Sequence, residues 1–311
     1  MGRSIVIGDV HGCLNELKAL VQKLDYRQGD DHIIFVGDLI DRGPYPVETV
    51  AYAMQLGAYT IRGNHEDNAL RWLLYEDRVA REPGFKNPME HQAVRERRKA
   101  KSGTRELTPE AMELRRQRQE ARLARGEPAV APQTPRQRKA HTHVIPEERK
   151  AEWRQLSARQ RSYLDSCVYV DLSADWYVVH GGLETKPLIE EQDAERIMRL
   201  RYVWPDTGHM APSESGTLDQ PTGSVWWMEA WRGPMNVIYG HAVHSLAEPR
   251  IDVCQTTTGS EVRCFGIDTG CCYGGRLTAM VFADENSLRD PTFVQVESEQ
   301  PRIHLPPGVP S

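Results

Sequence analysis

Residues 4–12 read SIVIGDVHG, a β-branched apolar run that ends abruptly at a Gly-Asp pair. The same transition recurs in HIIFVGD at 32–38, and a third strand-like run, AYTIRGN at 58–64, ends at Gly-Asn. Between these runs, residues 13–24 and 46–56 place their apolar side chains at helical spacing. Strands that alternate with helices predict a parallel α/β core. The polar residues follow each strand, at the sheet edge where open α/β sheets carry their sites.

Further strand-like runs occur at 167–170, 176–179, 237–239 and 262–267. The chain contains five polar clusters that follow such runs: GDVHG at 8–12, GDLIDRG at 37–43, GNHE at 63–66, VHGG at 179–182 and YGH at 239–241. A single Gly-Asp is usually a turn, a lone buried histidine is usually a core residue, and an arginine such as Arg42 usually forms a surface ion pair. Five clusters of one chemistry, each after a strand, favour a functional site instead.

The residue types in these clusters indicate metal chemistry. Asp, Asn and His side chains supply oxygen and imidazole ligands for divalent cations such as Mn, Fe or Zn. Two such ions roughly 3.5–4 Å apart can hold the attacking and leaving oxygens of a phosphoryl displacement. The guanidinium of Arg42 can bind phosphate oxygens through two parallel hydrogen bonds. The clusters therefore favour a metal-dependent reaction at phosphorus.

Composition limits the class of protein and the compartment that can be expected. The chain has 311 residues, of which 39% are hydrophobic and 27% are charged, so it can form a sizeable core and is not disordered throughout. No stretch approaches the roughly 18 to 20 apolar residues of a membrane span, and strand-like sequence starts where a signal peptide would lie. Six cysteines without a CxxC pair are typical of reduced thiols. We expect a cytoplasmic protein with no membrane partner.

Charge divides the chain into regions. Residues 78–150 contain 19 Lys and Arg against 10 Asp and Glu, a net charge of +9, whereas the remainder carries −14. Large apolar residues are sparse in this segment, a charged helix is expected only at 110–125, and prolines at 128, 132 and 135 end any regular pattern. We therefore predict one domain formed by 1–77 and 151–299, a basic and partly disordered insertion at 78–150, and a flexible Pro-rich tail at 300–311.

The five clusters, together with FGIDTGCCYGGRLT at 265–278, resemble the calcineurin-like metallophosphoesterases, specifically the bacterial type of the phosphoprotein-phosphatase (PPP) branch. The resemblance covers residues 4–77 and 164–283. It implies an α/β fold in which a β-sandwich of two mixed sheets is flanked by helices, with the metals at the sheet edge. It also implies two divalent metal ions, with Mn favoured and Fe or Zn as alternatives.

The resemblance assigns roles residue by residue. The implied metal ligands are Asp9 and His11 for the first ion, Asp38 as the bridge, and Asn64, His180 and His241 for the second. His65 would protonate the leaving oxygen with the help of Asp41. Arg42 would hold the phosphate together with a second arginine, for which Arg201 is favoured and Arg199 remains open. The implied mechanism is in-line attack by hydroxide bound to the metals. It needs no cysteine nucleophile, so Cys271 and Cys272 are assigned to packing.

The motifs allow three hypotheses for function. The favoured one is a phosphatase that hydrolyses phosphomonoesters of Ser/Thr phosphoproteins, and the alternative is a hydrolase of dinucleoside polyphosphates such as diadenosine tetraphosphate. Both act through the same site, so the partner is a phosphorylated protein or a nucleotide. Tryptophans at 204, 226, 227 and 231 could stack on a base, but a core or cleft-wall role is commoner for such residues. A binding protein that contacts nucleic acid through 78–150 is the remotest hypothesis, because acidic residues are interspersed there and aromatic interleaving is absent.

Overall fold

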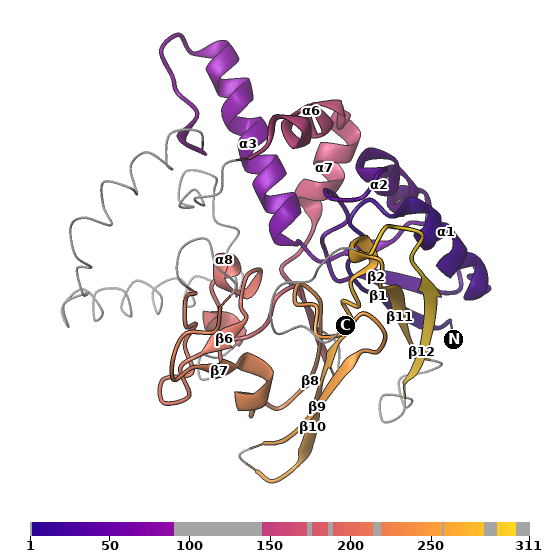
Figure 1. Cartoon of the computed structure of the whole chain (residues 1–311), viewed down its shortest axis with the longest axis vertical. Helices are drawn as coiled ribbons and strands as arrows, with labels where there is room; N and C mark the ends of the chain where they lie inside the picture. The colour runs from indigo at the N-terminus through magenta and orange to yellow at the C-terminus, as the bar shows by residue number, and fades with distance from the viewer. Residues whose placement is uncertain are drawn as a thin grey trace, which may run out of the picture.

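The computed structural model describes residues 2–89, 145–172, 176–185, 189–213, 219–256, 258–282 and 291–302. The helix expected at 110–125 and most of the tail expected at 300–311 lie outside the described residues. The described chain forms two five-stranded sheets, with helices gathered along one side of the molecule (Figure 1). No helix in this described part is both long and apolar enough to cross a membrane.

The first sheet has the strand order β12-β11-β1-β2-β3. Its strands are β1 (Ser4–Ile7), β2 (His32–Phe35), β3 (Tyr59–Thr60), β11 (Arg276–Phe282) and β12 (Thr292–Glu297). The first three strands run parallel, as the alternation of strand and helix predicts, with Ile7 opposite Phe35. β11 pairs antiparallel with β1 and with β12. The sheet is mixed because the end of the chain returns to its open edge.

The second sheet has the strand order β4-β5-β8-β10-β9. Its strands are β4 (Val170–Leu172), β5 (Trp176–Val179), β8 (Asn236–Tyr239), β10 (Glu261–Gly266) and β9 (Arg250–Gln255). The three central strands are parallel and both edge strands are antiparallel. A small ribbon, β6 (Tyr202–Val203) with β7 (Val225–Trp226), stands beside it.

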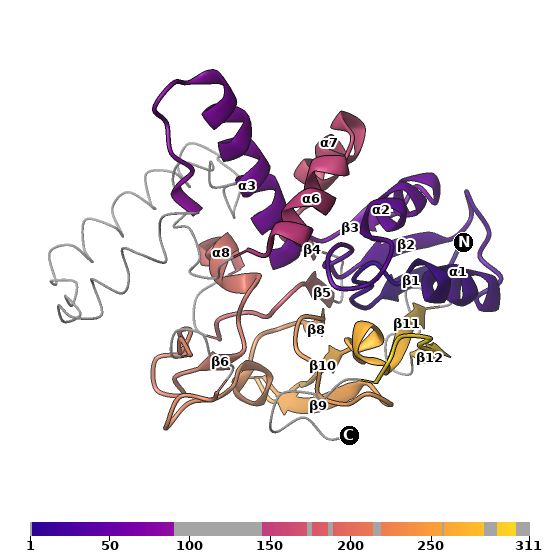
Figure 2. The same cartoon turned by 45° about the horizontal axis from the view of Figure 1, so that its top comes forward.

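Alternation along β1 shows how the layers are built. Val6 packs in a cluster shared by the two sheets, with Ile238 and Phe265 of the second sheet. Ile5 and Ile7 point the other way, into a core covered by helices. Those helices are α1 (Leu14–Lys23), α2 (Pro46–Gln55), α3 (Asn64–Arg81), α6 (Glu147–Gln155) and α7 (Ala158–Ser166), and Figure 2 shows them above the sheets. The predicted fold of two mixed sheets flanked by helices is confirmed.

The outer face of the second sheet is covered by short elements. These are α8 (Ala194–Ile197) and the 3-10 turns η1 (Ile189–Glu191) and η2 (Trp227–Ala230). Trp227 and Trp231 are buried in this layer beside Tyr239. Trp226 is half-buried and packs on Tyr202. A third 3-10 turn, η3 (Cys271–Tyr273), closes the loop before β11.

The ends of the expected insertion are part of the packed structure. Helix α3 continues to Arg81, past the expected boundary at 77. Beyond it, Met89 is buried, and Phe85 and Ile145 pack against the same helix-covered core. Residue 300 of the expected tail is also held, because Glu16 Oε1 accepts a hydrogen bond of 3.0 Å from Gln300 Nε2. All six cysteines are free thiols.

Candidate active site and metal centre

The site loops use a backbone conformation that side chains other than glycine rarely adopt. Among the described residues, six non-glycine residues have positive φ between 47° and 69°. Five of them belong to the predicted site, namely His11, Asp38, Asp41, Arg42 and His241. Left-handed backbone costs roughly 1–2 kcal/mol per residue, so the surrounding fold must impose it. These turns direct the polar side chains back over the strand ends.

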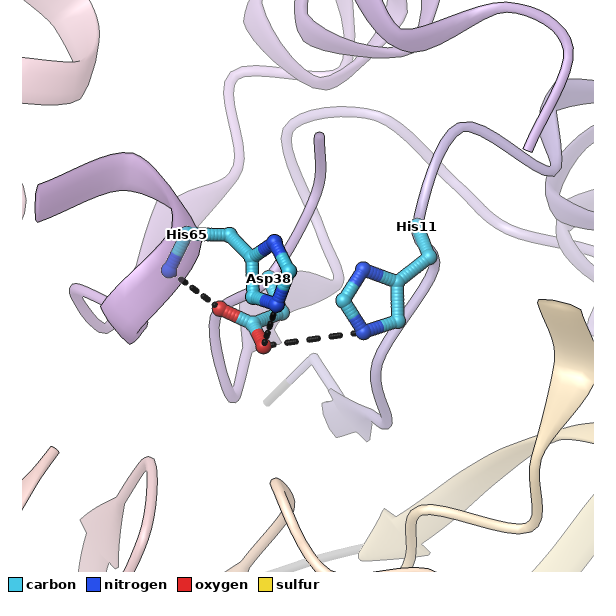
Figure 3. Close-up of side chains that lie close together, drawn as sticks. All are labelled: His11, Asp38 and His65. Atoms are coloured by element: carbon cyan, nitrogen blue, oxygen red, sulfur yellow. Dashed lines mark hydrogen bonds and ion pairs between the residues drawn. The ribbon is translucent and has the colours of Figure 1, made fainter. Parts of the chain in front are cut away.

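Asp38 lies at the centre of the cluster and is 1% exposed. Its Oδ1 accepts a hydrogen bond of 3.0 Å from the backbone N–H of His65. Its Oδ2 lies 3.6 Å from His11 Nε2, 3.8 Å from His65 Nε2 and 3.2 Å from His180 Nε2. Figure 3 shows the first two imidazoles converging on this carboxylate from the β1 loop and from the start of α3. One carboxylate oxygen therefore faces three imidazole nitrogens.

The orientation of two imidazoles leaves ligand atoms free at this point. Nδ1 of His11 lies 3.0 Å from the carbonyl of Ile40, and Nδ1 of His180 lies 2.9 Å from the carbonyl of Val36. Because a carbonyl only accepts, each Nδ1 carries a proton, and in the neutral imidazole each Nε2 presents a lone pair. That lone pair points toward the oxygen of Asp38. A divalent cation between the two satisfies both, so the donor set fits a metal.

The remaining predicted ligands adjoin this pair. Both oxygens of Asp9 accept from the backbone N–H of His241, and Asp9 Oδ2 lies 3.9 Å from His11 Nε2. Asn64 Oδ1 lies 3.1 Å from His180 Nε2, and the ring of His241 lies 5.0 Å from that of His180. Ligand atoms within 4.8 Å of one another form two groups that share Asp38: His11, Asp38 and His65, and Asp38, His180 and His241. The structure thus brings the six predicted ligands together.

The charges of the buried imidazoles and carboxylates at the centre of the cluster also favour the binding of a cation. Burial lowers the pKa of His11 and of His241 well below the usual value, so both imidazoles are neutral, the form that binds metals. Burial raises the pKa of Asp9, and the charge of Asp268 raises it further. Burial lowers the pKa of His180, but the charge and hydrogen bond of Asp38, with the charges of Asp9 and Glu66, outweigh this effect and raise the pKa to about 9. Nε2 of this ring therefore holds a proton that a bound cation would displace. Buried carboxylates this close together require positive charge beside them.

His65 is held by Asp41. His65 Nδ1 lies 2.5 Å from Asp41 Oδ2, so its Nε2 faces the cluster, 3.4 Å from Arg42 Nη2. The other oxygen of Asp41 accepts a hydrogen bond of 2.7 Å from Trp153 Nε1, and Arg149 Nε lies 3.5 Å from Oδ2. Neither contact from α6 was predicted, because this helix spans the end of the basic segment and no local pattern connects it with Asp41.

The three candidate arginines have different surroundings. Arg42 Nη1 hydrogen-bonds to the hydroxyl of Tyr273, whose ring also lies 5.1 Å from the guanidinium. Arg201 Nη2 donates to the carbonyl of His241 at 3.0 Å, and burial together with the charge of Arg42 lowers its pKa. Arg199 Nη2 is instead engaged by α3, at 3.3 Å from Asp67 Oδ2 and 3.1 Å from Asn68 Oδ1.

Glu66 is a further site residue that the sequence pattern contained without indicating its role. Its carboxylate is fully buried and accepts backbone N–H groups from Asp38 (2.8 Å), Leu39 (2.8 Å), Ile40 (3.3 Å) and Gly63 (3.0 Å). It therefore ties the loop after β2 to the start of α3. Gly63 is required beside it, because a Cβ there would lie 2.1 Å from Asp38 Oδ1.

Comparisons with known proteins agree with this site. Residues 2–104 match the family model for calcineurin-like phosphoesterase. Curated relatives named symmetrical bis(5'-nucleosyl)-tetraphosphatase include one from Klebsiella pneumoniae (strain 342), 25% identical over 92% of this chain and 94% of its own. Another, from Salmonella arizonae, is 27% identical over 94% and 95%. A solved structure described as a candidate diadenosine tetraphosphatase has a TM-score of 0.60 at 19% identity, covering 96% of this chain and 94% of its own.

These relatives correct one hypothesis. The favoured hypothesis, a phosphatase that acts on Ser/Thr phosphoproteins, is wrong, because relatives matched over more than nine-tenths of the chain are named as nucleotide hydrolases. The physical reason is that both substrate classes present a phosphorus to the same metals and arginines, so the motifs alone do not distinguish them. The resemblance to calcineurin-like metallophosphoesterases is confirmed by the family-model match over residues 2–104 and by the relatives matched over most of the chain. Residues 2–104 carry a calcineurin-like phosphoesterase domain, and the chain is a hydrolytic enzyme.

Proposed function

We propose that this enzyme is a symmetrical dinucleoside tetraphosphatase, which hydrolyses a substrate such as diadenosine tetraphosphate into two nucleoside diphosphates. The observation that carries the proposal is the near full-length match to relatives of that name, which spans both sheets and therefore the whole site. The phosphate-binding geometry is compatible with it. Arg42 Nη2 lies 3.4 Å from His65 Nε2 and Arg201 Nη2 donates to the carbonyl of His241, so each guanidinium is anchored at a predicted site residue.

The metal centre of this proposal uses the six predicted ligands. Asp9, His11 and Asp38 would hold one divalent ion, and Asp38, Asn64, His180 and His241 would hold the other. We propose Mn, with Fe or Zn as alternatives; when bound, such ions would polarise the phosphoryl oxygens and lower the pKa of water at neutral pH. The carbonyls of Ile40 and Val36 fix the rings of His11 and His180, so the ligand atoms are preorganised.

His65 and the arginines act on the substrate in this proposal. Asp41 keeps the Nδ1 proton of His65 engaged, so a second proton on Nε2 faces the cluster and can pass to the leaving oxygen. Arg42 and Arg201 bind phosphate oxygens. Burial and the positive charge of Arg42 lower the pKa of Arg201, and a bound phosphate would offset that repulsion. Arg199 is assigned to structure, because Asp67 and Asn68 already engage it.

Product analysis tests the proposal. Mn-loaded protein is incubated separately with diadenosine tetraphosphate and with a phosphoserine peptide, and the products are separated by anion exchange. We expect ADP as the sole nucleotide product and little release of phosphate from the peptide. Formation of AMP with ATP contradicts symmetrical cleavage, and turnover of the peptide alone contradicts the substrate class. A His65→Asn variant serves as the control for hydrolysis by a contaminating enzyme.

A further inference from the structure

The carboxylate of Asp41 is held from two sides. Its Oδ2 accepts from His65 Nδ1, and its Oδ1 accepts a hydrogen bond of 2.7 Å from the indole N–H of Trp153. Asp41 is 1% exposed and Trp153 is 2% exposed, so this hydrogen bond is shielded from water. Arg149, one turn earlier on α6, places Nε 3.5 Å from Asp41 Oδ2 and is about a third exposed. A helix that contains no predicted site residue therefore reaches the partner of His65.

Helix α6 is fixed in place by α3. The rings of Trp72 and Trp153 lie 5.8 Å apart, and the guanidinium of Arg154 lies 4.9 Å from the ring of Trp72. Arg154 Nη2 also pairs with Glu76 Oε1 at 2.7 Å. Because α3 begins at Asn64 and carries His65, the same helix positions both the imidazole and, through α6, the indole. The separation between His65 and the indole is thus set by helix packing.

Physical chemistry explains why this matters for His65. A carboxylate bonded through one oxygen can rotate about its χ2 angle, and a buried oxygen left without a donor costs about 1–3 kcal/mol. With the indole on Oδ1, the plane of the carboxylate is fixed and Oδ2 stays in line with His65 Nδ1. The direction of Nε2, and so of the transferable proton, follows from that alignment. Small errors in such geometry reduce rates strongly.

We infer that Trp153 is a positioning residue for proton transfer by His65: its indole N–H holds the carboxylate of Asp41 in the orientation that aims the imidazole, and Arg149 gives a second, weaker contact from the same helix. The inference rests on the proposed role of His65 as proton donor. If Trp153 were only a core aromatic residue, its substitution should lower kcat by the same factor for every substrate. A positioning role predicts losses that depend on how much protonation the leaving group needs.

The chain offers a matched control for removal of the indole N–H. Trp72 is as buried as Trp153 and touches it, yet its Nε1 has no hydrogen-bond partner among the described residues. Trp153→Phe and Trp72→Phe therefore delete the same atoms from one cluster, and only the first removes a donor from Asp41. Arg149→Met and Arg159→Met form a second pair: Arg149 lies near Asp41, whereas Arg159 is an exposed residue of α7 that makes none of the contacts described above for α6.

The experiment measures kcat and KM of each Mn-loaded variant for phenyl phosphate, a poor leaving group, and 4-nitrophenyl phosphate, a good one. Metal content and thermal unfolding are recorded for each protein. In Trp153→Phe we expect kcat for phenyl phosphate to fall about 10- to 100-fold with KM unchanged. The loss for 4-nitrophenyl phosphate should be much smaller, and Arg149→Met should show the same pattern more weakly. Combined with His65→Asn, Trp153→Phe should cause no further loss.

Two outcomes overturn the inference in distinguishable ways. If His65→Asn itself shows no dependence on the leaving group, the proton-donor role fails and the inference fails with it. If His65→Asn shows the dependence but Trp153→Phe behaves like Trp72→Phe, the inference alone is wrong. Should Trp153→Phe unfold, the comparison of Arg149→Met with Arg159→Met decides, and equal behaviour of those two variants contradicts the inference.

Discussion

The backbone N–H of His241 donates to both carboxylate oxygens of Asp9, at 3.2 and 3.1 Å, across 232 residues of sequence. Asp9 follows β1 of the first sheet and His241 follows β8 of the second. The contact therefore joins the two sheets at the edge where the predicted ligands gather. Gly240 permits it, because a Cβ at this position would lie 2.0 Å from Asp9 Oδ1.

Removal of metal should abolish activity and lower stability. Chelation leaves Asp9 and Asp38 buried without compensating cations, so we expect loss of aryl phosphate hydrolysis and a lower Tm. A ligand at 100 times its Kd stabilises the folded state by about 2.7 kcal/mol, which predicts recovery of Tm as Mn is titrated back. Calorimetry and elemental analysis on the same samples check this. Full activity in protein verified to be metal-free contradicts it.

Glu66→Gln should destabilise the site loop. The substituted amide presents N–H groups toward backbone donors, so the hydrogen bonds to Asp38 and Gly63 are lost on one side of the carboxylate. We expect a loss of about 2–4 kcal/mol in the free energy of unfolding and weaker metal binding. Glu76→Gln on the same helix removes only a partly exposed ion pair with Arg154 and should cost less than about 1 kcal/mol. Equal losses of the two variants in urea unfolding would contradict the role of Glu66 in tying the loop after β2 to the start of α3.

Asp31 should control part of the acid stability. Hydrogen bonds from Arg3 and Arg27 lower the pKa of this buried carboxyl. Because the folded pKa is depressed, the stabilisation is present above the unfolded pKa of about 3.9 and is lost as pH falls toward the folded pKa. Asp31→Asn should therefore reduce the free energy of unfolding by about 2–4 kcal/mol near neutral pH. It should also weaken the fall of that free energy as the pH is lowered. Asp30→Asn, at the exposed neighbouring position, is the control. If urea unfolding shows the same dependence of stability on acidic pH in both variants, the prediction is contradicted.

The domain proposal, with 78–150 as an insertion, gives a deletion test. We expect that replacing 90–144 with a Gly/Ser linker leaves a folded, metal-binding protein with unchanged kcat for 4-nitrophenyl phosphate. A wider deletion over 85–150 should not behave this way. It removes Phe85, Ile145 and the buried Met89, whose loss alone costs about 2–5 kcal/mol, together with Arg149. Thermal unfolding of both deletions decides, and aggregation of the shorter one shows that 90–144 belongs to the core.

Much of the first sheet and of the metal cluster is predictable from sequence alone. The strands β1, β2 and β3 and the helices α1 and α2 lie where apolar periodicity predicts them. Asp9, Asp38 and Asn64 are predictable as neighbours, because residues that follow parallel strands meet at one edge of a sheet. The sequence pattern does not predict helix α3. This helix begins inside the GNHE motif, where polar residues conceal the apolar spacing of the later turns.

Side-chain contacts between segments that are distant in the sequence were determined by the tertiary structure alone. Nothing local distinguishes Arg201 from Arg199, but packing turns one guanidinium toward His241 and the other toward Asp67. Nothing in the sequence around Trp153 predicts its hydrogen bond to Asp41, 112 residues away. Backbone preferences and apolar periodicity act over a few residues, so the sequence determined the strands, their polar ends and the chemistry of the ligands. Contacts between side chains of different elements depend on helix and sheet packing, so only the folded chain determined which arginine hydrogen-bonds to His241 and which helix holds Asp41.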